Sequence, residues 1–150
     1  MVRALQLSID NVLSGRGGPF GAVIVKDGSI VAEGANRVTA TNDPTAHAEV
    51  VAIRQACSAL GNFELKNCEL YTSCEPCPMC LGAIYWARLE RIYYGGIAAD
   101  AAEAGFDDSF IYREIEKPFG TRKIPMVQMM REHALAGFRA WVEKPNKILY

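Results

Sequence analysis

The chain has 150 residues, of which 50% are hydrophobic and 22% are charged, the balance of an ordinary globular protein. A chain of this length fits one domain and buries roughly 68–70% of its unfolded surface, enough to fold without disulfides. The formal net charge of −1 argues against a broad nucleic-acid surface and leaves only a local basic patch open. No stretch approaches the ~20 apolar residues of a membrane span, and residues 1–15 lack the apolar run of a signal peptide.

The five cysteines point to a metal rather than to disulfides. Their number is odd, and Cys74, Cys77 and Cys80 crowd into one short stretch. In a chain without a secretory signal such crowding favours metal binding, and we expect a cytoplasmic protein. Cys57 and Cys68 lie in apolar patterns and are expected in the core.

The N-terminal part predicts one helix followed by a β-hairpin. Apolar residues recur with helical spacing from Val2 to Leu13, and the helix is expected to end near Gly15. Residues 21–25 and 29–35 are rich in Val and Ile, as strands are, and Asp27-Gly28 between them is a hairpin signal.

The rest of the chain predicts alternating helices and strands. Residues 36–45 are polar and loop-like, and Asp43-Pro44 offers a cap and a proline for a helix over residues 45–60. The remaining predicted elements are a strand at 68–72, a helix at 78–87, a strand at 91–95, mixed helix and loop at 100–120, a strand at 125–130 and a helix at 132–143. This order indicates an α/β layered fold with a mixed sheet, in a single domain over residues 1–150.

The stretch from His47 to Cys80 carries the chemistry. His47-Ala48-Glu49 is followed by Pro76-Cys77-Pro78-Met79-Cys80, the His-x-Glu and Pro-Cys-x-x-Cys signature of zinc-dependent nucleobase deaminases. One imidazole and two thiolates leave the fourth position of a tetrahedral zinc free for water, as in catalytic sites. Glu49 lies about 200° around an ideal helix from His47, so it is expected to reach the bound water as a proton carrier rather than the metal.

Other interpretations of these residues stay open from spacing alone. A lone His before an apolar helix is usually structural, and a lone Cys-x-x-Cys can be a structural zinc knuckle or a redox pair. A closed structural site would need a fourth ligand, for which Cys74 is the candidate. The combination of both motifs at helix starts favours the catalytic zinc.

At these residues the chain resembles the cytidine deaminase-like superfamily. The resemblance covers most of the chain and implies a three-layer α/β/α sandwich with a central five-stranded mixed sheet. It also implies a zinc cofactor and hydrolytic deamination, with release of ammonia from an amidine-like ring carbon.

Four stretches resemble particular branches of that superfamily. Residues 36–49 (NRVTATNDPTAHAE) resemble the purine-acting branch, which includes guanine deaminases and tRNA adenosine deaminases. Residues 101–112 (AAEAGFDDSFIY) and the terminal Ile148-Leu149-Tyr150 resemble bacterial guanine deaminases, and residues 72–88 do so less specifically. This implies that the substrate is a small purine, guanine, which is converted to xanthine in purine catabolism or salvage.

The resemblance also implies roles for individual residues. His47, Cys77 and Cys80 are the implied zinc ligands, Glu49 is the proton shuttle, and the implied substrate contacts are Phe20, Asn36, Ala48, Asp108 and Tyr150. Members of this branch form homodimers in which the C-terminal segment, here about residues 131–150, can be exchanged between subunits. Tyr150 would then close the partner's site.

The chemistry of two of these side chains agrees with guanine. Guanine carries two donors, its N1–H and its exocyclic amine, and an ionised Asp108 can only accept hydrogen bonds. Adenine has no N1–H, so a carboxylate there would discriminate against it. Asn36 offers a donor and an acceptor, which suits a base edge. The residues alone leave open whether Asp107 or Asp108 faces the substrate, whether Asn36 is only a turn residue, and whether Phe20 is only core.

Competing functions follow from the same motifs. A tRNA adenosine deaminase would need clustered basic residues for phosphates, yet the last twenty residues mix basic with acidic side chains and end apolar. Cytosine deaminase is a further enzyme alternative. A zinc-stabilised binding module is the non-enzyme alternative, and the presence of Glu49 argues against it.

Overall fold

The computed structural model describes residues 1–150 as two compact units, residues 1–111 and residues 112–150. None of the helices has the length and apolar character that a membrane crossing requires.

A four-stranded mixed sheet forms the centre of the first unit, in the order β2-β1-β3-β4. The strands are β1 (Gly21–Lys26), β2 (Ser29–Ala35), β3 (Cys68–Cys74) and β4 (Arg91–Gly96). β1 runs antiparallel to both β2 and β3, whereas β3 and β4 are parallel. The predicted hairpin turn is confirmed: Asp27 and Gly28 have φ angles of 50° and 77°, which this dipeptide adopts readily.

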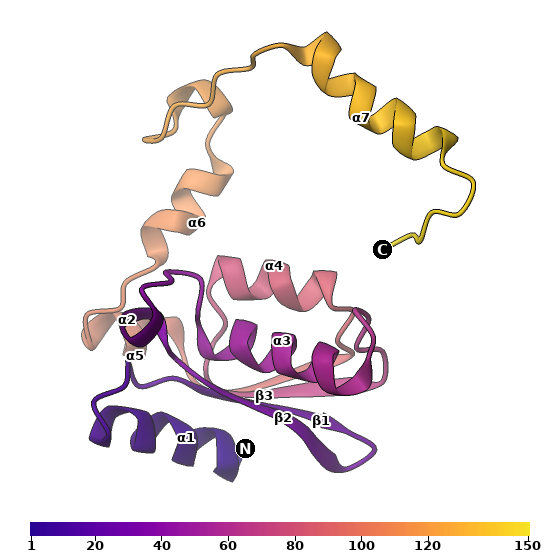
Figure 1. The fold of residues 1–150 in the computed structure, drawn as a ribbon. Coiled ribbons are helices and arrows are strands. Elements are labelled where there is room, and N and C mark those ends of the chain that lie inside the picture. Colours follow the sequence, from indigo (N-terminus) through magenta and orange to yellow (C-terminus); the bar gives the residue numbers. More distant parts are fainter. The chain divides into compact units, whose positions relative to one another are not determined.

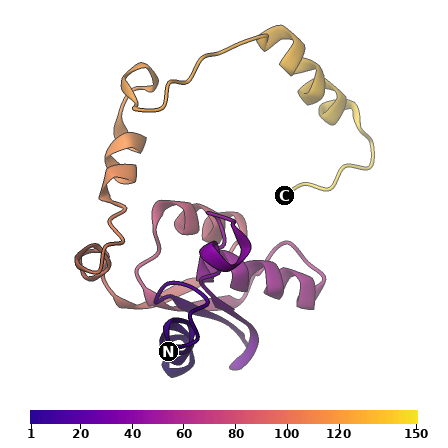
Figure 2. The same cartoon turned by 60° about the vertical axis from the view of Figure 1, so that its left-hand side comes forward.

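Helices cover both faces of the sheet (Figure 1). α1 (Val2–Leu13) packs on one face, and α3 (Ala48–Leu60) and α4 (Pro78–Trp86) lie together on the other, as the turned view also shows (Figure 2). The core lies mainly between the sheet and α3, and includes the fully buried Ile24 and Leu70. The predicted three-layer α/β arrangement is therefore confirmed.

The contact of α3 with β2 fixes the depth of the helix start. A Cβ atom built on Gly34 would collide with the carbonyl oxygen of Ala48 and would lie 2.7 Å from the amide nitrogen of Ala52. Only glycine lets the two backbones approach this closely. The first turn of α3 is thereby held directly against the sheet, with Glu49 facing inward at 6% exposure.

The start of α3 differs from the prediction. The helix begins at Ala48 rather than at residue 45, because Asp43 Oδ1 accepts hydrogen bonds from both the amide and the hydroxyl of Thr45 (2.8 and 2.6 Å) and closes a turn there. His47 is consequently the N-cap residue of α3. The short α2 (Val38–Thr41) lies within the stretch that was predicted as loop.

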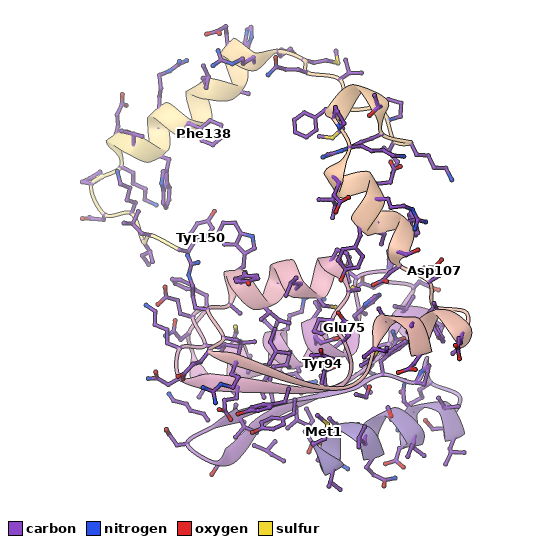
Figure 3. All side chains as sticks on the ribbon, turned by 180° about the vertical axis from the view of Figure 1, so that it is seen from behind. Met1, Glu75, Tyr94, Asp107, Phe138 and Tyr150 are labelled. Atoms are coloured by element: carbon purple, nitrogen blue, oxygen red, sulfur yellow. The ribbon has the colours of Figure 1, made fainter.

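Helices α5 (Ala98–Glu103) and α6 (Ser109–Glu116) follow the sheet, and α6 runs into the second unit. The second unit also contains the 3₁₀ turn η1 (Phe119–Thr121) and α7 (Arg131–Glu143). Neither α6 nor α7 has a buried residue. Figure 3 shows Tyr150 at the end of the segment that follows α7.

The prediction of a fifth strand at residues 125–130 is wrong. These residues have no regular structure, and the sheet has four strands rather than the expected five. The apolar composition of the segment suits a strand, but a strand also needs a neighbour for its backbone N–H and C=O groups, and the segment pairs with none. Met130 then adopts a left-handed conformation (φ 52°) as the N-cap of α7.

Candidate metal centre and adjoining cavity

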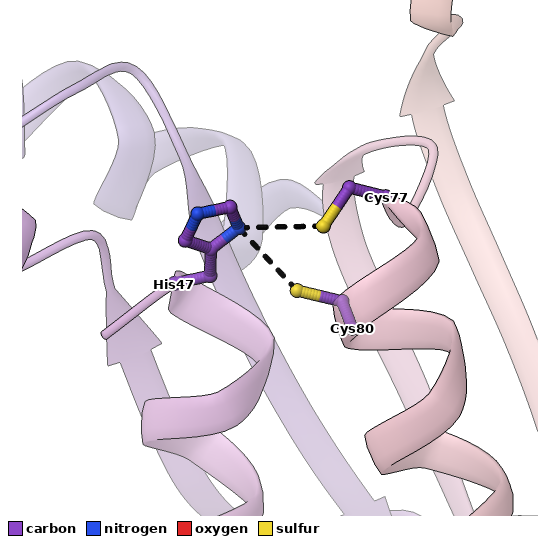
Figure 4. A group of neighbouring side chains, drawn as sticks. All are labelled: His47, Cys77 and Cys80. Atoms are coloured by element: carbon purple, nitrogen blue, oxygen red, sulfur yellow. Dashed lines mark hydrogen bonds between the residues drawn. The ribbon is translucent and has the colours of Figure 1, made fainter. Parts of the chain in front are cut away.

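Three potential ligands converge where α3 and α4 begin. His47 is the N-cap of α3, Cys77 is the N-cap of α4, and Cys80 lies in the first turn of α4. The Nδ1 atom of His47 lies 3.5 Å from the Sγ atoms of both cysteines (Figure 4). All three ligand atoms lie within 4.8 Å of one another.

This geometry fits zinc. With Zn–S near 2.3 Å, Zn–N near 2.0–2.1 Å and tetrahedral angles, N and S ligands of one ion lie about 3.6 Å apart. The observed 3.5 Å separations agree with this value. Cys74 is not part of the group; its thiol donates to the carbonyl of Ile97 at 3.7 Å. The structure therefore brings together a three-ligand centre rather than the closed site of three cysteines and one histidine that Cys74 would complete.

The electrostatics of the centre favour an ionised sulfur. Hydrogen bonding from the Cys80 thiol, opposed by burial and aided by His47, lowers the pKa of Cys77 to about 4. The pKa of Cys80 is raised by hydrogen bonding with Cys77, by burial and by the negative charge of Glu49. The pKa of His47 is raised, first by its hydrogen bond with Cys77. Two helix N-termini add positive potential at the same place, which stabilises thiolates.

Glu49 lies beside this centre and is almost completely buried. Its Oε1 atom accepts a hydrogen bond from the Thr72 hydroxyl at 3.3 Å, and its Oε2 atom lies 3.4 Å from Cys80 Sγ. Burial raises the pKa of the Glu49 carboxyl. A carboxyl group in this position can take up and release a proton at the edge of the metal centre.

A cavity of about 490 Å³ opens over the centre. His47, Glu49 and Cys77 line it, together with three of the predicted substrate contacts, Phe20, Asn36 and Asp108. The remaining lining residues are Gly15, Gly17, Gly18, Val38, Thr39, Cys74, Glu75, Ala98, Ala101 and Phe106. The volume and mixed polarity suit a small planar heterocycle.

The two other predicted substrate contacts are not among the lining residues of the cavity. Ala48 is fully buried and is not among the lining residues. Tyr150 belongs to the second unit, where its ring packs edge-on against Trp141 with the centroids 6.4 Å apart. Their contacts with substrate stay predictions.

The amide of Asn36 has a defined orientation. Its Oδ1 atom accepts hydrogen bonds from the backbone amides of Gly18 (3.4 Å) and Val38 (3.3 Å), so Nδ2 remains as the free donor in the cavity wall. The backbone of the same wall is held from α1: Asn11 Nδ2 donates to the carbonyls of Asn36 (2.8 Å) and Gly18 (2.9 Å).

The two neighbouring aspartates have different surroundings. Asp107 Oδ1 accepts the amide of Ser109 at 2.9 Å, at the start of α6, whereas Asp108 lines the cavity. The pKa of Asp108 is raised by partial burial and by the negative charge of Cys77. On the same side, the rings of Phe20 and Phe106 pack edge to face with centroids 4.9 Å apart. These rings offer an apolar wall beside the carboxylate.

Sequence reasoning missed several residues of the site. Thr72, which contacts Glu49, stands at an inward position of β3 where the alternation predicts an apolar residue. Glu75, labelled in Figure 3, accepts the Ala98 amide at 3.0 Å and holds the start of α5 against the cavity. Glu75 stands inside the cysteine motif, so its position was a usable signal; nothing in the sequence pointed to Asn11.

Comparison with known proteins places these features in context. Residues 1–96 match the cytidine and deoxycytidylate deaminase zinc-binding region. The chain is 61% identical over 148 residues to the guanine deaminase of Bacillus subtilis (strain 168), covering 99% of this chain and 95% of that protein. It is 52% identical over 77 residues to the tRNA-specific adenosine deaminase of Agrobacterium fabrum, covering 51% of each protein.

A solved structure resembles the whole chain. The X-ray structure of guanine deaminase from Bacillus subtilis has a TM-score of 0.97 and 60% sequence identity, and the match covers 99% of this chain and 95% of that one. The likeness thus extends past the zinc-binding region, through residues 97–150.

Proposed function

Because the chain belongs to the cytidine and deoxycytidylate deaminase family, we propose that it hydrolyses guanine to xanthine and ammonia. The assignment of guanine as the substrate rests on how much of the chain resembles a guanine deaminase. A guanine deaminase matches 99% of the chain, whereas a tRNA-specific adenosine deaminase matches 51%. Residues beyond the zinc-binding region, which include Asp108, therefore have counterparts in an enzyme that is named for guanine.

His47, Cys77 and Cys80 would hold the zinc ion of this family. Their donor set of one nitrogen and two sulfurs suits zinc, and their 3.5 Å N–S separations fit its bond lengths. Zinc held there would supply Lewis acidity that makes water a better nucleophile at neutral pH.

Glu49 moves the protons in this proposal. Water adds its oxygen to C2 of guanine, the carbon that carries the amino group, and Glu49 takes the proton that the water loses. Glu49 gives this proton to ring nitrogen N3, then takes the hydroxyl proton and gives it to the amine. The C2–N bond breaks, ammonia leaves, and the new C2=O and N3–H of xanthine remain. The buried position of the carboxyl, with its raised pKa, suits a group that carries protons in both directions.

Asn36 and Asp108 orient the purine. Asn36 Nδ2 is the free donor of its amide and suits an acceptor on the guanine edge, such as O6 or a ring nitrogen. Asp108, as a carboxylate, accepts from the N1–H that guanine has and adenine lacks. Phe20 and Phe106 provide the apolar surface against which a flat base packs. A site with such polar groups rejects analogues that leave them unpaired.

The test is ammonia release by the zinc-loaded protein from guanine, adenine, cytosine and tRNA in parallel. We expect turnover of guanine and little of the other three. Turnover of tRNA without guanine would keep the family's chemistry and overturn the substrate. If the zinc-loaded protein releases no ammonia from any of the four substrates, the proposal that it is a deaminase of this kind would be contradicted.

We also infer a cytoplasmic homodimer with exchange of residues 131–150. The cysteines are all free, and zinc binding needs reduced thiolates, which a reducing compartment maintains. Apolar side chains lie exposed on two elements: Tyr85 and Trp86 on α4 (72% and 64%) and Phe138 and Val142 on α7 (both 69%). Patches of this kind mark protein interaction sites.

Complementation between two inactive chains tests the exchange. One chain carries Glu49→Gln and an intact terminus; the other keeps Glu49 and lacks residues 148–150. If termini are exchanged, co-expression creates one site with both an intact Glu49 and an intact terminus, and guanine turnover returns. If each terminus serves its own chain, no mixed dimer is active. Light scattering of the wild-type chain, which we expect to be dimeric, provides the control.

A further inference from the structure

Thr72 is a polar residue in the core of the sheet. In β3 the residues at positions 68, 70 and 72 alternate onto the face that α3 and α4 cover, and all three are buried. Cys68 and Leu70 are apolar, as that face requires, whereas Thr72 places a hydroxyl there at 1% exposure. A hydroxyl buried at such a position is unfavourable unless it has a hydrogen-bond partner.

The partner of this hydroxyl is Glu49. Thr72 Oγ1 donates to Glu49 Oε1 across 23 residues of sequence, at 3.3 Å. The Glu49 carboxylate has two side-chain donors in the structure, the Thr72 hydroxyl on Oε1 and the Cys80 thiol on Oε2. The two oxygens are therefore held by different elements, one by β3 and the other by α4.

Zinc changes this balance. A cysteine that ligates zinc is a thiolate and has no proton to donate. Once Cys80 serves as a ligand, Thr72 is the side-chain donor that remains to Glu49. Oε1 then stays anchored to the sheet, and Oε2, on the side of Cys80 and the metal centre, is the oxygen that is free to carry a proton.

We propose that Thr72 is a positioning residue for the reaction: its hydroxyl holds Glu49 Oε1 so that Oε2 faces the metal centre and the reacting water. The inference deepens the proposed function and rests on it. Thr72 is neither a member of the ligand group nor a lining residue of the cavity. Its effect should therefore reach turnover through Glu49 and leave zinc and substrate binding in place.

Thr72→Val provides the test, because valine keeps the volume and shape of threonine and removes only the hydroxyl. We expect kcat on guanine to fall about 10-fold or more, the effect of losing a hydrogen bond to a charged group. KM, zinc stoichiometry and the affinity for the product xanthine should stay unchanged. Thr72→Ser, which keeps the donor, should recover most of kcat.

The matched control is Ser73→Ala, which removes a neighbouring buried hydroxyl of the same strand. The Ser73 Oγ atom accepts the Gly21 amide at 3.0 Å and does not contact Glu49, so kcat should be unchanged. A second readout uses the Glu49→Gln variant. Adding Thr72→Val to it should lower kcat little further, because both substitutions affect the same proton-transfer step.

Three results would overturn the inference. They are an unchanged kcat in Thr72→Val, a loss of zinc or xanthine binding that accounts for the lost turnover, or a Ser variant no better than Val. If the valine variant does not fold, Thr72→Ser decides on its own: with the melting temperature of wild type it should keep most of the wild-type kcat, and a loss of kcat at an unchanged melting temperature would overturn the inference. The proposed function fails separately, if wild type releases no ammonia from guanine; the same variants are then compared on the base that wild type does deaminate.

Discussion

The two sides of the cavity are built in different ways. The metal side consists of residues 47–49 and 77–80, which stand at the starts of two adjacent helices and meet within one small centre. The substrate side consists of residues 17–20, 36–39 and 106–108, which come from separate loops and from the start of the short α2. The first side is set by helix geometry, and the second by tertiary hydrogen bonds.

This difference predicts different responses to mutation. On the metal side each residue has one task and no substitute, so a single change should abolish metal binding or proton transfer. On the substrate side several loops share the work of recognition, and a change should weaken it by degrees.

Cys77→Ala should have the largest effect. With one thiolate removed the ligand group loses a third of its donors, so we expect zinc to be lost on purification and turnover with it. Zinc content and ammonia release measure this.

Zinc uptake by the metal-free wild type should also release protons, because the Cys80 thiol and the His47 imidazolium lose theirs when they bind the metal. The affinity for zinc should therefore fall as the pH falls.

Cys74→Ser is the matched control for the ligand prediction. Cys74 lines the same cavity but donates to Ile97 and lies outside the ligand group, so this variant should keep full zinc. Loss of zinc from Cys74→Ser would contradict the three-ligand centre and restore the four-ligand interpretation.

Glu49→Gln should lower kcat by roughly 10²- to 10⁴-fold, the usual contribution of a positioned acid or base. Glutamine keeps the size of the side chain but cannot carry the proton. Zinc content and melting temperature should stay near wild type, because Glu49 is not in the ligand group. Turnover that survives this change would remove Glu49 from the mechanism.

The same contrast explains which residues could be predicted from the sequence. Cys77 and Cys80 are three residues apart at one helix start, where spacing alone brings their sulfurs onto one side. His47 stands at the start of another helix, and its place in the ligand group follows from the recognised deaminase motif. The role of Thr72 follows from a contact across 23 residues, which no local pattern reveals. The sequence likewise does not distinguish Asp107 from Asp108. In the structure Asp107 accepts the Ser109 amide, whereas Asp108 lines the cavity.

The fold shows a similar limit. The α/β layering and the first four strands follow from local periodicity, because each strand has a partner that is close in sequence or joined by one helix, whereas the three layers are implied by the family resemblance. Residues 125–130 have the composition of a strand as well, and the prediction there is wrong because pairing, rather than composition, makes a strand. Pairing is a property of the neighbouring chain segment and is absent from a local pattern.

Asp108→Asn tests the substrate side. The change replaces an acceptor-only carboxylate by an amide of the same shape, which keeps one acceptor, adds a donor and loses the charge-assisted bond from guanine. We expect kcat/KM for guanine to fall about 10- to 100-fold, the cost of leaving polar groups mismatched in a desolvated site, with zinc content unchanged. Asp107→Asn is the control: Asp107 accepts the Ser109 amide and is not among the lining residues of the cavity, so kcat/KM should stay near wild type. The reverse pattern would exchange the roles of the two aspartates.

Asn11→Ala should have the smallest effect, because Asn11 touches no substrate. Its amide, only 4% exposed, donates to the carbonyls of Gly18 and Asn36 and so holds the wall that carries the Asn36 side chain. Loss of two neutral hydrogen bonds should raise KM for guanine about 2- to 10-fold and leave kcat and zinc content unchanged. Alanine favours the helix, so α1 itself should not weaken.

Ser8→Ala is the control. It is a buried change on the same helix that removes a hydrogen bond to the Leu5 carbonyl, and it should leave KM unchanged. An unchanged KM in Asn11→Ala would mean that the loops hold their own shape, and the substrate side would then be as locally determined as the metal side.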